Sequence, residues 1–405
     1  MVMAAQKTEK TLLEKFDFFQ IIFLLHVVGL LIQPHLEMVI PLYYPIYNNE
    51  LIRIIICAWI GYAIGRISMK FLLHRKDIGV LQKSTDYEYQ FLPTLIVLQF
   101  LFVMSRYLVR GTPLFSSSPG YTKGLFLIEP TYGATRVLYI LLPLSVLTYF
   151  GIQFRGKNIL NTKNMIYFFC GLIPLFVGLF KGSVITYMGG LVLLYDKNYK
   201  RIKLKLRALL LIVGLLSIPI AQYYYSEGNK DFKQSASYVF QRLLVYSTEG
   251  FNFIYFANMP SNFDLQMRYC FGLEKYPEAP GITLSREMTG QQDPNFATVA
   301  TLYGYCWQNG GIVSVVISFF FLGLAISSIV FLFSKKDNHP FWDSFLIMLY
   351  TVLLKLVLVG EPFNDLRGPI VSLVFSIVVF SLLRKIKTIS PNKENEDSLP
   401  RKSAL

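Results

Sequence analysis

Stretches of about 20 apolar residues recur along the whole chain, and they restrict its fold more than any other feature. Such stretches lie near residues 16–36, 50–72, 90–109, 134–153, 208–225, 311–333, 341–360 and 369–386. The composition agrees, because 53% of the 405 residues are hydrophobic and only 16% are charged. Soluble domains average about 25% charged residues. We therefore predict an all-α, polytopic integral membrane protein.

A further apolar region, residues 165–195, is interrupted by Lys181-Gly182-Ser183. With 31 residues it is too long for one straight span and short for two. We predict two abbreviated helices that meet at a loop sunk below the outer surface, where surrounding protein or a wet cavity satisfies the backbone. A single long, tilted helix is the alternative. With the two short helices included, the chain has about ten transmembrane helices.

Positive charge is concentrated in alternate connections between these stretches. The segments 1–15, 73–89, 154–164, 196–207, 334–340 and 384–405 hold 23 of the 39 Lys and Arg residues. The positive-inside rule predicts that these segments and both termini are cytoplasmic. Topogenesis accounts for most of the net charge of +14, so nucleic acid is not an expected partner. No small-residue cleavage site follows the first apolar stretch, which we interpret as a retained helix and not a signal peptide.

Two longer segments face the opposite side, at about residues 110–133 and 226–310. We divide the chain into N-terminal transmembrane helices (1–225), a large extracytoplasmic loop (226–310), C-terminal transmembrane helices (311–389) and a disordered cytoplasmic tail (390–405).

The large loop contains signals for three helices. Apolar spacing predicts an amphipathic helix over 235–247, with Arg242 off an apolar stripe of Ala236, Val239, Phe240, Leu243 and Tyr246. A capping-box pattern predicts a second helix from Ser261 to Gly272, which carries Arg268. Asp293-Pro294 predicts a third helix, with an Asp N-cap and Pro at its first position, that runs to Asn309.

Ten basic residues lie near the outer ends of the predicted spans or beyond them, against the usual bias: Arg53, Arg106, Arg110, Arg136, Lys181, Arg242, Arg268, Arg286, Lys355 and Arg367. For any one of them, snorkelling to a lipid headgroup is the alternative, and ion pairs within the loop are another for Arg242 and Arg268. Together they favour an anionic ligand. Because Arg pairs bidentately with phosphate, the cluster suits a lipid-linked phosphate or pyrophosphate.

The motifs of common soluble enzymes are absent from the sequence. It has no Walker loop, HExxH, CxxC or GxSxG pattern, and no His in the large outer loop. The outer loops offer no convincing metal cluster, so we expect neither a metal nor another cofactor. Cys270 and Cys306 both fall on the outer side, where an oxidising compartment would permit a disulfide.

Several short motifs resemble the bacterial oligosaccharide repeat-unit polymerases of the Wzy type. They are the large outer loop, the helix opening at Asp293-Pro294-Asn295-Phe296, Tyr303-Gly304-Tyr305, Asn309-Gly310-Gly311 and the onward apolar helix with Gly323. The paired short helices around Lys181-Gly182-Ser183 also resemble that family, whose members often carry a Gly-Ser-Arg-like turn there. The chain departs from that pattern by placing Lys before the Gly-Ser and Val after it.

The resemblance implies a GT-C-like glycosyltransferase of the inner membrane, active in O-antigen, lipopolysaccharide or capsule biosynthesis. Such polymerases move a growing glycan from undecaprenyl pyrophosphate to the next lipid-linked repeat unit at the periplasmic face, in pathways that also contain a chain-length regulator. Departure of the pyrophosphate requires neutralisation by a metal or by fixed cations. The candidate pyrophosphate-binding residues are Arg242, Arg268, Arg286, Lys181, Arg136, Arg110 and Lys355.

A sugar hydroxyl acceptor calls for a general base. Glu249, at the end of the predicted amphipathic helix, is the first candidate, with a solvated loop carboxylate as the alternative. Glu287, beside Arg286, is the second candidate. Asp293 is a weaker candidate because N-capping already explains it. Candidate sugar-binding residues are Tyr303, Tyr305, Trp307 and Asn295, with an interfacial aromatic belt as the alternative for the rings.

Two other functions fit the architecture. An O-antigen ligase-like transferase resembles this layout, but that family leads us to expect a catalytic His in the outer loop, and none is present. A flippase or transporter of lipid-linked oligosaccharide predicts repeat symmetry with broken helices in both halves. We find one candidate break and no clear repeat, so the polymerase is favoured.

Overall fold

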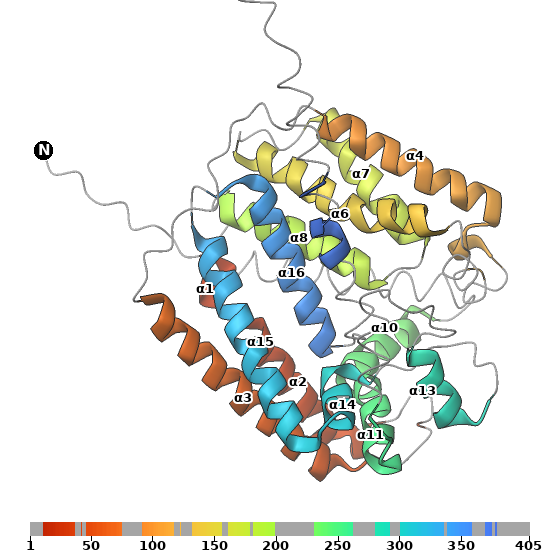
Figure 1. The fold of residues 1–405 in the computed structure, drawn as a ribbon. Helices are drawn as coiled ribbons and strands as arrows, with labels where there is room; N and C mark the ends of the chain where they lie inside the picture. The colour runs from red at the N-terminus through yellow and green to blue at the C-terminus, as the bar shows by residue number, and fades with distance from the viewer. Residues whose placement is uncertain are drawn as a thin grey trace, which may run out of the picture.

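The computed structural model describes residues 11–36, 42, 46–74, 91–116, 122, 132–155, 161–178, 181–198, 231–261, 280–291, 300–335, 338–358, 369–374 and 377–378. Every regular element named within these ranges is a helix, which confirms the all-α prediction for this part of the chain (Figure 1).

The elements are α1 (Leu12–Lys15), α2 (Phe18–Ile32), η1 (Gln33–His35), α3 (Asn48–His74), α4 (Leu92–Arg110), η3 (Pro113–Phe115), α6 (Tyr132–Arg155), α7 (Thr162–Val177), α8 (Lys181–Asn198), α10 (Phe232–Gln241), the π-helical segment η4 (Arg242–Tyr246), α11 (Ser247–Ala257), α13 (Pro280–Thr289), α14 (Thr301–Gln308), α15 (Gly311–Ser334) and α16 (Pro340–Leu358).

Five described helices are long and apolar enough to cross a membrane. They span Phe18–His35, Asn48–Leu73, Leu92–Phe115, Gly311–Ser334 and Pro340–Leu358. These helices coincide with five of the apolar stretches identified in the sequence, and the stretch at 134–153 forms α6. The predicted span at 208–225 and most of the one at 369–386 lie outside the described residues. The protein is therefore a helical membrane protein.

The region 165–195 forms two helices, as predicted. Helix α7 ends at Val177 with Gly178 as its C-cap, and α8 begins at Lys181. The two helices pack against each other, which excludes the single long helix. The break precedes Lys181, so this residue starts a helix instead of lying in the turn.

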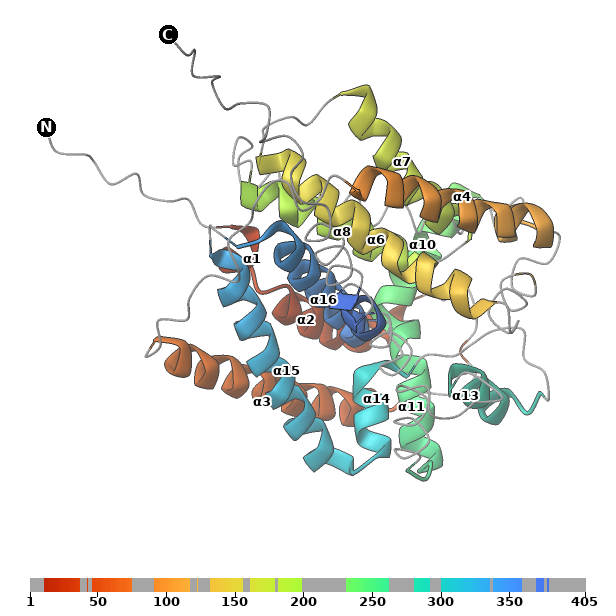
Figure 2. The ribbon, with the colours of Figure 1, turned by 45° about the horizontal axis from the view of Figure 1, so that its top comes forward.

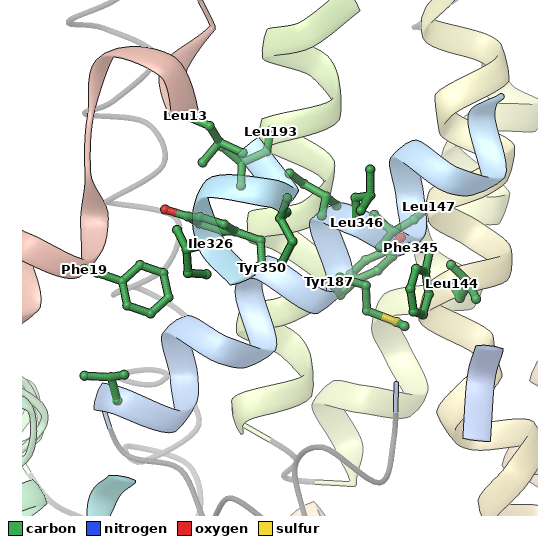
Figure 3. Close-up of a cluster of buried hydrophobic side chains, with 14 of the residues drawn as sticks. Leu13, Phe19, Leu144, Leu147, Tyr187, Leu193, Ile326, Phe345, Leu346 and Tyr350 are labelled. Atoms are coloured by element: carbon green, nitrogen blue, oxygen red, sulfur yellow. The ribbon is translucent and has the colours of Figure 1, made fainter. Parts of the chain in front are cut away.

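The membrane helices form two groups that α2 and α16 separate. Figure 2 shows α4, α6, α7 and α8 on one side and α3 with α15 on the other, with α2 and α16 between them. Helix α16 packs on both groups, because it contacts α6 and α8 as well as α15 and α2. In Figure 3, Phe345 and Leu346 of α16 face Leu144 and Leu147 of α6 and Tyr187 of α8. Tyr350 of α16 meets Phe19 of α2 edge to face, with ring centroids 5.6 Å apart.

Among the described helices, α3 and α15 pack most closely against each other. A side chain at Gly61 or Gly65 of α3 would collide with backbone carbonyls of Val316 and Phe320, and one at Gly323 of α15 would collide with the carbonyl of Tyr62. Small residues at helix interfaces in membranes allow backbones to approach in this way. The glycines of both helices thus set the separation of this pair.

The basic loops that share a predicted side of the membrane meet at one end of the bundle. The backbone N–H of Leu12 donates to Asp196 Oδ2 at 2.6 Å, and Arg155 and Lys197 both donate to Asp343. These contacts join four segments that the charge pattern places together, namely 1–15, 154–164, 196–207 and the connection before α16. We call the opposite end of the bundle the outer end.

Candidate functional site

At the outer end, α10, η4 and α11 form one continuous helical run from Phe232 to Ala257. The sequence predicts a helix that ends near residue 247, and this prediction is wrong. The chain stays helical through Gly250 because Phe251, Phe253 and Ile254 bury their side chains against the protein. Phe240, assigned to the apolar stripe, is exposed, whereas Val239 is buried as predicted.

The centre of this run is a π-helix, Arg242–Tyr246. Such segments are rare and frequently occur at functional sites. Here the π-helical segment packs directly on α2, where a side chain at Gly29 would overlap the carbonyl of Leu244. The glycine in the first membrane helix therefore gives this segment its position.

Glu249 lies in the first turn of α11 and is only 9% exposed. The sequence places it at a helix end, where a solvated carboxylate is the simplest interpretation, and the structure overturns that placement. Its neighbours Thr248 and Asn252 are fully buried. The Thr248 hydroxyl donates to the carbonyl of Val245 at 2.7 Å, and Asn252 Oδ1 accepts from the backbone N–H of Tyr47 at 3.0 Å. Glu249 thus belongs to a buried polar face of α11.

Arg242 lies on the same helical run, about two turns before Glu249. Its side chain is exposed, which confirms that it lies off the apolar stripe. One guanidinium nitrogen donates to the Tyr238 hydroxyl at 2.9 Å, one turn earlier in α10. The run therefore presents a cation outward and holds a carboxylate inward.

Arg286 and Glu287 lie on α13, a helix that is not among the three predicted for the large loop. Leu284 and Met288 of this helix are buried in a small core with Phe253 and Ile254 of α11 and with Ala300 and Tyr305. This contact leaves Arg286 half-buried and Glu287 exposed. Two signals in the sequence were available, namely Pro280 at the helix start and the apolar pair Leu284 and Met288 at four-residue spacing.

The predicted sugar-binding rings of α14 point largely into the protein. Tyr303 is fully buried, stacked on Phe319 at 5.0 Å and on Phe251 at 6.1 Å between ring centroids, and its hydroxyl lies 3.3 Å from His26 Nδ1. Burial raises the pKa of the Tyr303 phenol well above its ordinary value. Tyr305 is buried as well, while Trp307 is half-buried beside Tyr255. We therefore assign no stacking role to Tyr303 or Tyr305.

Four further predicted cations occur at the outer end of the bundle. Because Arg155, Lys197 and Asp343 meet at the opposite end, the start of α6, the start of α8 and the end of α16 all lie at the outer end. These places hold Arg136, Lys181 and Lys355. Helix α4 ends there too, since the hydroxyl of Tyr107 donates to the carbonyl of Pro174 near the end of α7. Its last residue is Arg110, which is exposed.

Other predicted site residues lie outside the described part of the chain: Arg268, Asp293 and Asn295. Cys270 also lies outside it, and Cys306 is a buried free thiol. Within the described ranges, no three His, Cys, Asp or Glu side chains lie close enough together to hold a metal ion. Of the ten outer cations, Arg53 has an intrahelical ion-pair partner, Glu50, at 2.9 Å.

Comparison of the chain with protein-family models found no match. Comparisons with curated proteins and with solved structures likewise found none.

Proposed function

We propose that this protein is a glycosyltransferase that joins lipid-linked oligosaccharide repeat units into a surface polysaccharide. One observation carries the proposal. The outer end of the bundle holds Arg110, Arg136, Lys181 and Lys355, and the helices of the large loop add an exposed Arg242 and a buried Glu249 at the same end. Cations that gather on the side where the positive-inside rule disfavours them call for an anionic substrate.

The chemistry follows from these two kinds of residue. In the proposed reaction, an acceptor sugar hydroxyl attacks the anomeric carbon of the donor glycan. The new glycosidic C–O bond forms as the bond to the lipid pyrophosphate breaks, and undecaprenyl pyrophosphate leaves. Arginine and lysine side chains stabilise the charge that develops on the leaving group. Glu249 accepts the hydroxyl proton as general base.

The proposal extends to the membrane arrangement. It places about ten spans in the bacterial inner membrane, in a GT-C-like layout, with both termini cytoplasmic and the loop 226–310 in the periplasm. A chain-length regulator of the same pathway is the expected protein partner. The five described apolar helices, the short α7 and α8 and the common end of the basic loops support this arrangement.

Deletion of the gene tests the proposal. We expect surface glycan that carries one repeat unit in place of a polymer, with polymer restored by the wild-type gene. A cell surface without any repeat unit would point to a ligase or a flippase, and a normal polymer would contradict the proposal altogether.

Complementation with Glu249→Gln tests the assignment of the base. This isosteric change removes the proton acceptor, so we expect single-unit glycan with normal protein levels in the membrane. Glu50→Gln is a matched control, because Glu50 is a partly exposed carboxylate near the outer end that pairs with Arg53. Polymer of normal length with Glu249→Gln would remove this residue from the mechanism.

A further inference from the structure

We propose that four aromatic rings at the outer end bind the sugar rings of the acceptor oligosaccharide, an assignment that rests on the proposed function. The rings belong to Phe256, Tyr47, Tyr255 and Trp307, which we call the aromatic row. Tyr47 stacks on Phe256 with ring centroids 5.7 Å apart and planes inclined by 15°. Tyr47 also lies 6.2 Å from Tyr255, which lies 5.3 Å from Trp307.

The aromatic row combines three segments that are far apart in the sequence. Tyr47 directly precedes α3, Tyr255 and Phe256 end α11, and Trp307 ends α14. Figures 1 and 2 both show α11 and α14 side by side near the start of α3. Tyr47 is held there because its backbone N–H donates to Asn252 Oδ1 at 3.0 Å.

These rings are accessible, unlike those of Tyr303 and Tyr305. Tyr47 is 41% exposed and Phe256 is 54% exposed, while Tyr255 and Trp307 are half-buried. Aromatic rings that are fixed by neighbours and open on one side give a ligand apolar contact area at low entropic cost. The C–H faces of pyranose rings are apolar surfaces of this shape.

Uncharged amide side chains flank the aromatic row. Asn48, which follows Tyr47 in the chain, is oriented by its Nδ2, which donates to Gln33 Oε1 at 3.3 Å. On the other side, Gln308 Nε2 donates to the carbonyl of Pro260 at 2.9 Å, and the Ser261 hydroxyl donates to Asn309 Oδ1 at 2.9 Å. An amide offers both donors and acceptors to sugar hydroxyls. Such a border offers hydrogen bonds to a hydroxyl-rich ligand.

The position of the aromatic row also suits an acceptor. Tyr255 follows Glu249 by six residues on α11, which is about 9 Å along a helix axis at 1.5 Å per residue. An oligosaccharide that stacks on the row can therefore extend a terminal hydroxyl towards the proposed base, while the cations at the outer end hold the donor pyrophosphate.

The test is direct binding with purified protein in lipid nanodiscs. The probe is the soluble repeat-unit oligosaccharide that mild acid releases from the host cell's own lipid-linked intermediates, observed by saturation-transfer NMR. We expect Tyr47→Ala to bind about tenfold more weakly than wild type, because one face of the row is lost. Tyr47→Trp should retain binding. Phe115→Ala is the matched control, since Phe115 is an exposed ring that follows α4 and lies outside the row.

Two outcomes would overturn the assignment. One is wild-type protein that does not bind the oligosaccharide. The other is Tyr47→Ala protein that binds the oligosaccharide as well as wild type does. Such a variant that only inserts less efficiently would show that Tyr47 is a membrane-interface anchor. If the gene deletion leaves polymer normal while Tyr47→Ala still weakens oligosaccharide binding, the proposed function fails. The aromatic row then remains a sugar-binding site, but not one for a polymerase acceptor. If Glu249→Gln binds normally but makes no polymer, both stand.

Discussion

Lys197 and Asp343, which are 146 positions apart in the sequence, form a buried ion pair with 2.7 Å between Nζ and Oδ1. A second cation, Arg155, reaches the other carboxylate oxygen at 2.9 Å, and Asn338 Nδ2 donates to Oδ1 at 3.2 Å. Lys197 also lies over the ring of Phe333, 4.7 Å from its centroid. One carboxylate thus ties α6, α8 and the start of α16 together at the end of the bundle remote from the candidate site.

Asp343→Asn should lower the stability of the folded protein by about 3–5 kcal/mol, the usual effect of breaking a buried ion pair. The Lys197 and Asp343 side chains are only 6% and 1% exposed, so Lys197 would be left as a buried cation with little access to water. Thermal unfolding in detergent micelles measures the change. Glu50→Gln is the control, because the Glu50–Arg53 pair is much more exposed and should contribute less than about 1 kcal/mol. Equal shifts in the two variants would contradict a structural role for Asp343.

Gly323→Leu should separate α3 from α15 and destabilise the protein by about 1–3 kcal/mol, or prevent its insertion. The added side chain would collide with the backbone carbonyl of Tyr62 in α3. A backbone atom cannot move aside by a change of rotamer. Size-exclusion profiles and unfolding midpoints report the effect. Ala325→Leu adds a comparable side chain to an exposed position on the same helix and should leave both measurements unchanged.

Arg242→Ala should slow polymerisation about 10- to 100-fold, in line with the loss of a hydrogen bond to a charged group. Chain-length analysis of the surface glycan in complemented deletion cells gives the result. Arg242→Lys should restore part of the activity, because it keeps the charge but loses the bidentate geometry. Lys233→Ala is the matched control, an exposed cation on α10 nine positions earlier. Polymer of normal length in cells with Arg242→Ala would show that this residue does not bind pyrophosphate.

Single cysteines should report the sidedness of the bundle. In a background without the four native cysteines, a membrane-impermeant maleimide should label Lys233→Cys on α10 in intact spheroplasts. It should label Lys163→Cys, in the first turn of α7, only after permeabilisation. Both positions are exposed, so access to the reagent depends on the side of the membrane alone. Labelling of both from the outside would refute the proposed orientation.

The long apolar helices could be predicted from the sequence because a run of about 20 apolar residues has few alternatives in a membrane. The presence of a break in residues 165–195 could also be predicted, because Lys181-Gly182-Ser183 interrupts an apolar run too long for one span, although these three residues begin α8 instead of forming the turn. Helix α13 is harder to predict, because only two of its apolar residues, Leu284 and Met288, are buried. They are buried in a small core shared with α11, which the local sequence does not reveal.

The sequence does not predict which single side chains are buried, because burial depends on segments far away in the chain. The surroundings of Tyr303 come from α2, α11 and α15, and its contact with His26 joins residues 277 positions apart. A tyrosine in a Tyr-Gly-Tyr motif looks the same in the sequence whether its ring is open or enclosed. Glu249 illustrates the reverse case, since Gly250 suggests a helix end and tertiary packing keeps the helix intact.

The contact between Gly29 and Leu244 has a mechanical consequence. At Gly29 no side chain separates α2 from the backbone of the π-helical segment, so a displacement of that segment at Leu244 would press directly on the first membrane helix. The opposite end of α2 is joined to α3, because Asp17 accepts from the Tyr62 hydroxyl at 2.8 Å and pairs with Arg66 at 3.3 Å. Helix α2 thus links the π-helical segment at the outer end to α3 at the opposite end through direct contacts.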